Sequence, residues 1–395
     1  MAELAINGGT PTRATLLNYG HQWIDEDDIQ AVTNVLRGDW LTTGPTVAAF
    51  ETAIAAHVGA KEAIAVNSGT AALHAAACAA EIGPGDEVIV TPMSFVASAN
   101  CILFMGSTPV FADVCPDTLN IDPIEIRKKI TAKTKAIVAV DFGGQPCQHS
   151  EIRAIAEEYN LTVIEDASHA LGATYCGNSV GTLQKLTTLS FHPVKHITTA
   201  EGGMVVTDDA DLAKKMRSFR THGVDVDFHK RAEANLWLYD VVSLGYNYRL
   251  PDINCALGLS QLSKLSQWVE RRRQIAKRYN QAFATLPEVA PLEQDATSES
   301  SWHLYVIRLN LEMIKVSRKE IFKALRAENI GVNVHYIPIH TLNLYQKLGY
   351  KTGSLPVVEA AYERILSLPI YPAMTDEDVK NVIDAVNKVI QYYRA

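Results

Sequence analysis

Three separated segments of the sequence carry residue types that could act together on one small ligand. They are Asn67–Leu73, Glu165–Ala170 and Ser190–His196. The first offers hydroxyl groups around a glycine, the second carboxylates and an imidazole, and the third an amine. Such groups can bind a phosphate, hold a protonated ring nitrogen and form a Schiff base with an aldehyde.

Ser68, Gly69 and Thr70 follow the β-like run Ala63–Val66 and open an alanine-rich helical stretch. A helix N-terminus presents free N–H groups and a partial positive charge, so it can hold phosphate. Gly69 would let the backbone come close, and the two hydroxyl groups would add donors. The alternative is that Ser68 or Thr70 only caps the helix.

Asp166 and His169 come just after the apolar β-like run Leu161–Ile164. A carboxylate at the end of a buried strand must be paired or hydrogen-bonded to stay charged, and a protonated heterocyclic nitrogen would be such a partner. His169 could donate a hydrogen bond to an adjacent oxygen. The alternative is a capping aspartate and a packed histidine.

Lys195 lies between the β-like runs Leu189–Phe191 and Met204–Val206. A lysine in a partly dry pocket has a lowered pKa and can form a Schiff base, although a single lysine is usually solvated. Together the three segments match the needs of pyridoxal 5′-phosphate, whose ring nitrogen must stay protonated and whose aldehyde must be held. Phe95 could stack on the ring or belong to the core.

The elements that must position these residues alternate between β-like runs and helices from about residue 62 to residue 206. This alternation predicts an α/β fold with a mostly parallel sheet and helices on both faces, and a ligand site at the carboxyl ends of the strands. Expected strands lie at 63–66, 87–90, 109–111, 136–140, 161–164, 189–191 and 204–206, and expected helices at 25–36, 50–58, 95–105 and 151–159.

A change of composition after about residue 255 predicts a second unit. Leu259–Leu286 reads as one long helix in which Arg271–Arg273 form a solvated face. Strands are expected at 303–309 and 330–339, and helices at 318–328 and 376–393. We therefore expect an N-terminal segment and large cofactor-binding domain over residues 1–258, and a bridging helix and small C-terminal domain over residues 259–395.

Composition narrows the classes of function. The 395 residues carry a formal net charge of −8, which argues against a nucleic-acid binder. The six cysteines show no CxxC or Cys/His metal spacing, so we expect reduced thiols and no metal site. The sequence shows no signal peptide and no stretch suited to span a bilayer, so we expect a cytoplasmic protein without membrane contact.

The chain resembles the DegT/StrS-type sugar-nucleotide aminotransferases, a branch of the fold-type I pyridoxal phosphate enzymes. The resemblance covers Leu17 to about Tyr392. It is carried by Ile24–Asp28, Leu41–Pro45, Asn67–Leu73, Glu165–Gly172, Ser190–Gly203 and Gly245–Arg249. It implies a large α/β domain with a mostly parallel sheet and a smaller C-terminal α/β domain.

The resemblance also implies roles for single residues. Lys195 would be the Schiff-base lysine and the acid/base of catalysis, and Asp166 would pair with the pyridine nitrogen. His169 would contact the phenolic oxygen of the cofactor, where many relatives have Gln, and Phe95 would stack on the ring. His192 and His196, which flank the lysine, are expected to be structural.

The same resemblance implies a homodimer with shared active sites. Asn247 would reach the phosphate site of the partner subunit, with Arg249 beside it. The phosphate itself would be held by Ser68, Gly69, Thr70 and Ser190.

Two motifs, Ser190–Gly203 and His335–His340, look most like one subgroup of the family. That subgroup makes UDP-4-amino-4,6-dideoxy-N-acetyl-β-L-altrosamine, a pseudaminic acid precursor, from a UDP-sugar with L-glutamate as amino donor and 2-oxoglutarate as by-product. Expected substrate contacts are Tyr19, Trp40, Leu41, Thr42, Arg249, His335, Tyr336, Ile337, Pro338, Ile339 and His340. The N-terminal Leu4–Gly9 instead resembles members that act on antibiotic sugars.

Alternative functions stay open. The enzyme could act on another nucleotide-linked ketosugar, such as a dTDP sugar, at C3 or C4. A sugar 3-dehydratase of the family would have histidine in place of Lys195, and a cysteine desulfurase would need a cysteine on a mobile loop. A catalytically silent regulatory or binding protein would have lost Lys195 or Asp166, and both are present.

Overall fold

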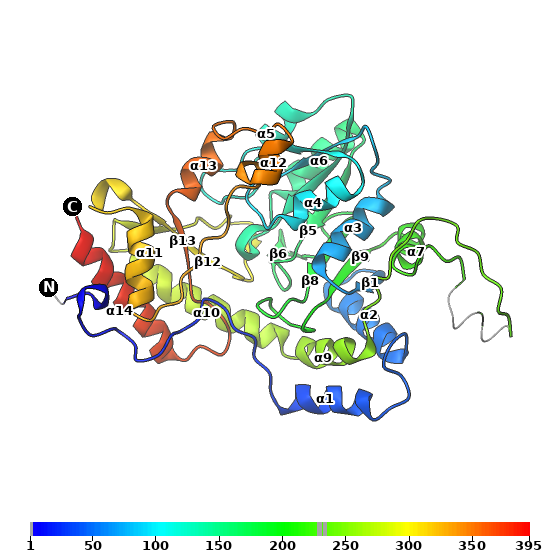
Figure 1. The fold of residues 1–395 in the computed structure, drawn as a ribbon, viewed down its shortest axis with the longest axis horizontal. Coiled ribbons are helices and arrows are strands. Elements are labelled where there is room, and N and C mark those ends of the chain that lie inside the picture. Colours follow the sequence, from blue (N-terminus) through cyan, green and yellow to red (C-terminus); the bar gives the residue numbers. More distant parts are fainter. Residues whose placement is uncertain (1–2, 227–230, 232–234) are drawn as a thin grey trace.

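A computed structural model of the chain describes residues 3–226, 231 and 235–395, and its centre is a seven-stranded sheet in the order β1-β9-β8-β5-β4-β2-β3 (Figure 1). Neighbours from β3 to β8 run parallel, whereas β9 is antiparallel to both β8 and β1. The predicted mostly parallel sheet is therefore confirmed, with one reversed strand. The strands are β1 (Glu62–Val66), β2 (Glu87–Val90), β3 (Thr108–Phe111), β4 (Thr134–Val140), β5 (Thr162–Asp166), β8 (Leu186–Ser190) and β9 (Gly203–Thr207).

Helices cover both faces of this sheet because residues along each buried strand point alternately to the two sides. On one face Ile64, Val66 and Val205 pack against α3 (Gly69–Ala79), α4 (Ala97–Phe104) and α7 (Ala210–Phe219). On the other face Ala65 and Val206 pack against α2 (Pro45–Val58) and α9 (Asp252–Leu262), and α5 (Pro123–Lys129) and α6 (His149–Tyr159) cover β4 and β5. Helix α1 (Glu26–Leu36) lies outside α9.

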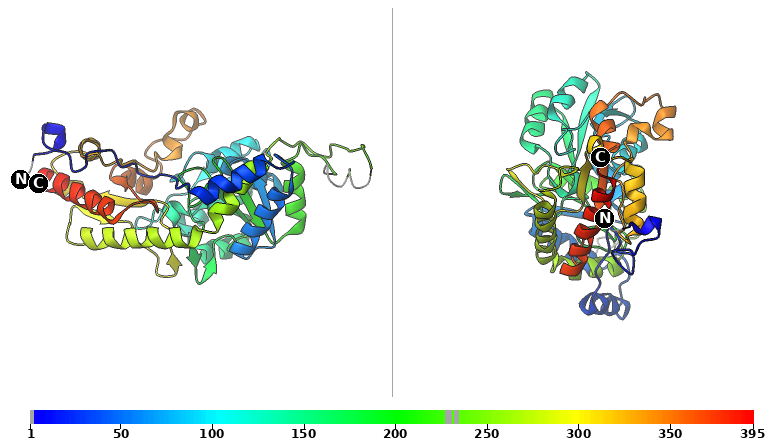
Figure 2. Two further views of the ribbon diagram at one scale, coloured as in Figure 1. Left: turned by 90° about the horizontal axis from the view of Figure 1, so that it is seen from below. Right: turned by 90° about the vertical axis from the view of Figure 1, so that its left-hand side faces the viewer.

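A smaller antiparallel sheet forms the centre of the C-terminal part. Its strands are β10 (Val289–Pro291), β12 (Tyr305–Leu309) and β13 (Ile365–Leu368), and its core is closed by α10 (Leu265–Phe283), α11 (Arg318–Ala327) and α14 (Asp376–Tyr393). Leu4 and Leu17 of the N-terminal segment also belong to this core, and this segment lies beside α14, where the Asn7 amide donates to the Tyr392 hydroxyl (3.1 Å; Figure 2). The N-terminal segment thus packs on the C-terminal unit, while the domain boundary after residue 258 stays a prediction.

Short elements complete the described part of the chain. They are η1 (Ala5–Asn7), η2 (Phe142–Gly144), β6 (Thr174–Tyr175), β7 (Asn178–Ser179), β11 (Ser298–Glu299), η3 (Leu311–Met313), η4 (Ile339–Thr341), α12 (Asn343–Lys347) and α13 (Pro356–Tyr362). Among the described helices, none combines the length and apolar character that crossing a bilayer requires.

The single long helix predicted over residues 259–286 is wrong. The structure has two helices, α9 and α10, which are separated at Ser263 and Lys264. Ser263 Oγ donates to the Ser260 carbonyl (2.7 Å), and the Lys264 ammonium is ion-paired with Asp28 (2.9 Å) and Asp25 at the start of α1. The ion-pair partners of Lys264 come from a distant part of the chain, so periodicity within the segment could not reveal the break.

The predicted solvated arginine face of α10 is also wrong. Arg272 is only 2% exposed, and its guanidinium donates to the carbonyls of Ile370 (2.9 Å) and Trp302 (3.2 Å). Arg273 Nε donates to the Ser300 carbonyl (3.1 Å). The arginines therefore tie α10 to loops of the C-terminal unit, because those carbonyls find their donors here.

The strand predicted over residues 330–339 does not form. The segment has only isolated bridges at Ile330 and Asn333, and Asn333 pairs there with Ser367 of β13. The edge of the small sheet is instead β13, a short buried run that the sequence analysis did not predict. The 333–336 segment is thereby left free to line the pocket described next.

Candidate functional site

A cavity of about 540 Å³ lies at the carboxyl ends of the central strands, as expected for a sheet of this kind. It is lined by the start of α3, the ends of β5 and β8, the loop before α4, and the 333–336 segment of the C-terminal unit. The three sequence segments therefore meet at one place. Of the predicted site residues the cavity collects Tyr19, Ser68, Gly69, Thr70, Phe95, Asp166, His169, Ser190, Lys195, His335 and Tyr336.

The start of α3 forms a cradle that fits a phosphate. Ser68 is the N-cap, and its Oγ accepts a hydrogen bond from the Ala71 N–H (3.0 Å). Ser68 therefore does cap the helix, and its hydroxyl hydrogen can still be donated to a ligand. The first-turn N–H groups of Gly69 and Thr70 lie before the intrahelical ladder begins. A Cβ on Gly69 would lie 2.9 Å from Ser190 Cβ, so only glycine lets β8 end this close to the helix.

Asp166, the last residue of β5, is 3% exposed and its carboxylate is fully hydrogen-bonded. Ser98 Oγ donates to Oδ2 (2.6 Å), and Ser168 donates to Oδ1 through its Oγ (2.6 Å) and N–H (3.2 Å). Donors on both oxygens hold the carboxylate in one orientation, and a carboxylate is the kind of partner that a protonated ring nitrogen needs. Ser98, with Ser94 2.8 Å away, was not predicted as a site residue; two serines four positions apart in an apolar helical stretch were the available signal.

Lys195 lies partly buried in the loop between β8 and β9, with its backbone N–H bonded to the His192 carbonyl (2.9 Å). Burial lowers the pKa of its amine to about 8, although the Asp166 charge acts in the opposite direction. A fraction of the amine is therefore neutral near pH 7 and able to attack an aldehyde. His196 is buried and donates to the Ser301 carbonyl (3.2 Å), whereas His192 is exposed at the cavity wall.

His169 lies between two other rings of the cavity wall. Its imidazole stacks on His303 with centroids 4.5 Å apart, and its Nε2 is 3.1 Å from the Tyr336 hydroxyl. His303 was not predicted as a site residue. A histidine at the start of the strand expected over residues 303–309 was the only signal in the sequence, and it did not distinguish a site residue from a packed one.

Several predicted residues lie outside the cavity. Ile339 and His340 are fully buried and do not line the cavity, and His340 Nε2 lies 2.9 Å from Glu359 Oε1. Asn247 is exposed, and its carbonyl accepts from the Asn67 side chain (3.4 Å). The other predicted residues outside the cavity are Trp40, Leu41, Thr42, Arg249, Ile337 and Pro338.

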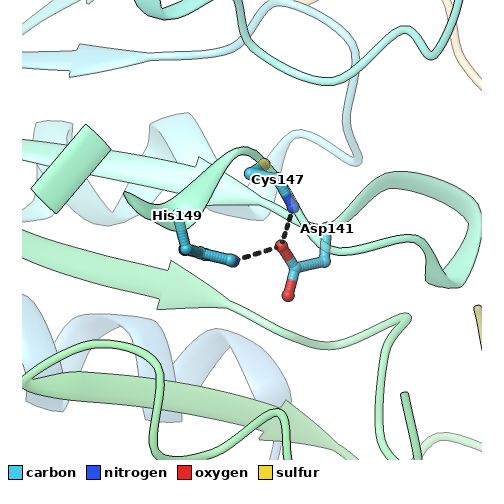
Figure 3. Close-up of side chains that lie close together, drawn as sticks. All are labelled: Asp141, Cys147 and His149. Carbon is cyan, nitrogen blue, oxygen red and sulfur yellow. Dashed lines mark hydrogen bonds and ion pairs between the residues drawn. The ribbon is translucent and has the colours of Figure 1, made fainter. Parts of the chain in front are cut away.

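A second buried cluster lies behind the sheet and contains side chains of metal-ligand type, Asp141, Cys147 and His149 (Figure 3). Both His149 nitrogens have neighbours, since Nε2 lies 2.9 Å from Asp141 Oδ1 and Nδ1 lies 3.1 Å from the Gln184 amide nitrogen. The Cys147 thiol donates to the Val140 carbonyl (3.1 Å). These hydrogen bonds join the end of β4 to the start of α6.

Glu165 completes this cluster from β5, with its Oε1 3.5 Å from His149 Nε2. Its Oε1 and Asp141 Oδ2 are buried and have no hydrogen-bond partner among the described residues. Burial raises the pKa of Glu165 to about 8, so this carboxyl can carry a proton near pH 7 and supply a donor to its neighbour. Because Glu165 and Asp166 are adjacent in one strand, the network and the cavity lie on opposite faces of the sheet.

The chain matches a known protein family and individual proteins of known sequence or structure. The profile of the DegT/DnrJ/EryC1/StrS aminotransferase family matches residues 22–387. The spore coat polysaccharide biosynthesis protein SpsC of Bacillus subtilis is 44% identical over 383 residues, which are 96% of this chain and 98% of that protein.

Solved structures of relatives share the fold, and two of them show how close the likeness to the chain is. Helicobacter pylori PseC, an aminotransferase involved in the biosynthesis of pseudoaminic acid, is 36% identical with a TM-score of 0.89, covering 96% of this chain and 100% of PseC. The PLP-form of Spr1654, a putative sugar aminotransferase from Streptococcus pneumoniae, is 32% identical with a TM-score of 0.89, covering 95% of this chain and 99% of that one.

Proposed function

The chain belongs to the DegT/DnrJ/EryC1/StrS aminotransferase family and is a pyridoxal-phosphate-dependent sugar aminotransferase of fold type I, and we propose that it aminates C4 of a UDP-linked 4-keto-6-deoxy-N-acetylhexosamine. L-Glutamate would supply the amino group and leave as 2-oxoglutarate. The product would be a UDP-4-amino-4,6-dideoxy sugar of the pseudaminic acid precursor type. The observation that carries this proposal is the likeness to PseC over nearly the whole of both chains.

We propose that the cofactor is held by the residues that form the cradle and the floor of the cavity. Ser68, Gly69, Thr70 and Ser190 would bind its phosphate. Asp166 would keep its ring nitrogen protonated, and Phe95, whose side chain is 58% exposed at the cavity, would stack on its ring. When bound, pyridoxal 5′-phosphate supplies an electron sink and carries the amino group between the two substrates.

Lys195 would hold the cofactor through its Nζ between turnovers and, once released, move the proton between the cofactor carbon and the substrate carbon. Its pKa of about 8 suits this task, because an amine near its pKa can both accept and return a proton. The cysteine desulfurase alternative finds no support, since none of the cysteines lines the described cavity.

We propose that the enzyme is a homodimer with shared sites, and an exposed apolar arm supports this. The arm comprises the described residues 235–244 after α7, which extend away from the rest of the chain (Figure 1). Trp237 is 84% exposed and Leu244 79%, and Leu236, Leu238, Tyr239, Val241 and Val242 are all more than half exposed. An apolar patch of this kind marks a protein contact, and a second copy placing Asn247 at its partner's phosphate cradle would cover it.

Mixing two inactive variants tests the shared site. Lys195→Ala and Asn247→Ala chains should each be nearly inactive, while their hybrid dimer contains one site with both wild-type residues. A random equal mixture should therefore recover about a quarter of the wild-type activity. Confirmed hybrid dimers without any recovery would show that Asn247 acts within its own chain, and an active Asn247→Ala enzyme would show that Asn247 is not needed at all.

The substrate is tested by running the reaction in reverse. Enzyme, 2-oxoglutarate and single amino sugars are incubated, and glutamate is followed by mass spectrometry. We expect a UDP-4-amino-4,6-dideoxy-N-acetylhexosamine to react at least about 100-fold faster than dTDP-linked or 3-amino sugars. The likeness to SpsC favours a second candidate substrate, another nucleotide-linked ketosugar that serves polysaccharide synthesis. If a dTDP-linked amino sugar reacts faster than the UDP-linked one, this second candidate is the better assignment.

We also propose that residues 1–258 and 259–395 are the two domains and that the enzyme works in the cytoplasm. The separate core around β10, β12 and β13 supports the first statement. Nucleotide-sugar substrates support the second, because such activated sugars are made inside cells.

A further inference from the structure

The ring of His169 is held in one orientation by three neighbours. His303 stacks on one side, with a 28° angle between the rings, and the plane of the Tyr336 ring is nearly parallel to that of His169, at 12°. Phe142 packs edge-on with its centroid 6.4 Å away. His169 is 2% exposed, so its ring cannot turn without moving this wall.

The two nitrogens of His169 differ in their surroundings. Nε2 lies 3.1 Å from the Tyr336 hydroxyl, and Nδ1 is buried with no hydrogen-bond partner in the described part of the chain. A buried nitrogen without a partner costs stability unless a ligand supplies one. His169 lines the cavity with Nε2 already engaged, so Nδ1 is the ring nitrogen left without a partner.

The ring carries a single proton. Burial lowers the pKa of His169 well below its ordinary value, and the charge of Lys195 lowers it further. Burial raises the pKa of the Tyr336 phenol, so this group keeps its hydrogen at neutral pH. The neutral imidazole can therefore either accept the phenol hydrogen at Nε2 and carry its own proton on Nδ1, or do the reverse.

We propose that Tyr336 is a positioning residue whose hydroxyl donates to His169 Nε2 and so keeps the imidazole proton on Nδ1, directed at the phenolic oxygen of the bound cofactor. The inference rests on the proposed cofactor site. The hydrogen bond at one imidazole nitrogen decides which nitrogen is protonated, and an anionic oxygen needs a donor rather than a second lone pair. Tyr336 thus acts through His169. This role is separate from the substrate contact that the sequence analysis expects for Tyr336.

The donor would matter because, with the cofactor bound, its phenolic oxygen and the nitrogen of Lys195 would compete for one proton. An N–H that occupies the oxygen weakens its attraction for the proton on the nitrogen, so the pH at which that proton is lost falls. The other titratable groups that act on this pair are His303, His196 and His335, which act on His169, and Asp166, which acts on Tyr336. Burial lowers the pKa of each of these three histidines, to about 3 for His335. They therefore stay neutral around neutral pH and do not add a charge that changes during the titration described next.

A double-mutant cycle tests the proposal on the loaded enzyme, with the pH midpoint of its visible absorption band as readout. Tyr336→Phe should raise this midpoint by roughly 0.5 to 1 pH unit, since it removes one hydrogen bond behind the donor. In a His169→Gln background the same change should have no effect, because an amide donates without depending on a tautomer. Tyr350→Phe, which removes one hydroxyl bonded to the Pro109 carbonyl outside the cavity, is the matched control.

An equal shift in both backgrounds would overturn the proposal, because Tyr336 would then act on the cofactor directly. Selective ¹⁵N-histidine NMR supplies a readout that needs no turnover: the His169 Nδ1 resonance should have the shift of a protonated nitrogen, and Tyr336→Phe should move it toward the average of the two tautomers. A protonated Nε2 in wild type would contradict the proposal. If no visible band forms at all, the proposed cofactor site fails, while the NMR result still decides the tautomer.

Discussion

Replacing Lys195 with alanine should abolish covalent attachment of the cofactor and lower the rate of amino transfer by a factor of about 10³ or more. The alanine removes both the group that binds the aldehyde and the amine whose pKa of about 8 suits proton transfer. The loss should appear as disappearance of the visible band of the lysine adduct. After borohydride treatment, no cofactor-modified peptide should be found by mass spectrometry.

Lys185→Ala is the matched control for this experiment. Lys185 is a largely exposed lysine whose ammonium pairs with Asp209 (3.2 Å), and it lies outside the cavity. Its loss should leave the band, the trapped peptide and the rate nearly unchanged. A Lys195→Ala enzyme that retained a trapped adduct would move the Schiff base to another lysine and remove the basis of the proposed mechanism.

Replacing Asp166 with asparagine should lower the rate of amino transfer by about 10² to 10³, with the cofactor still bound. A neutral amide cannot stabilise a positive ring nitrogen, so the electron-withdrawing power of the ring falls, whereas the phosphate contacts at α3 remain. The two serines that donate to Asp166 lie 2.6 Å from its carboxylate oxygens, which places this negative charge at one point of the cavity. Single-turnover measurement of the half-reaction with L-glutamate reads the effect directly.

Two further variants test whether the rate loss in Asp166→Asn comes from the charge of the carboxylate or from its hydrogen bonds. Ser98→Ala removes one hydrogen bond to the carboxylate but leaves its charge, so its rate should fall by only about tenfold. Glu165→Gln changes the neighbouring carboxyl, which faces the opposite side of the sheet, and should affect stability more than the half-reaction. A rate in Asp166→Asn equal to that of wild type would show that the ring nitrogen has another partner.

Much of the fold and the heart of the site could be predicted from the sequence because the signals are local. Alternating β-like runs and helices reflect a period that each element carries in its own residues, and the seven strands of the central sheet were found in this way, whereas the short β6 and β7 were not. Ser68, Asp166 and Lys195 each follow or precede such a run. Since parallel strands end at one edge of a sheet, local reading was sufficient to bring them together.

Residues whose role depends on a distant partner could not be predicted in this way. Ser98 in α4 meets Asp166, 68 positions away, and Arg272 meets the Ile370 carbonyl, 98 positions away. His340 looked like a ligand contact from its motif, but the fold pairs it with Glu359 and buries it. Hydrogen bonds between elements depend on how those elements pack, and packing is not encoded in the spacing of any one segment.

The sequence by itself determined the chemical groups, the order of the elements and the edge of the sheet where those groups gather. Only the tertiary structure decided that His303 and Tyr336 hold the ring of His169 and that one nitrogen of that ring has no partner. It also decided that the 333–336 segment lines a cavity instead of joining a sheet. The physical reason is that composition and period describe one element at a time, whereas orientation, burial and proton position arise where several elements meet.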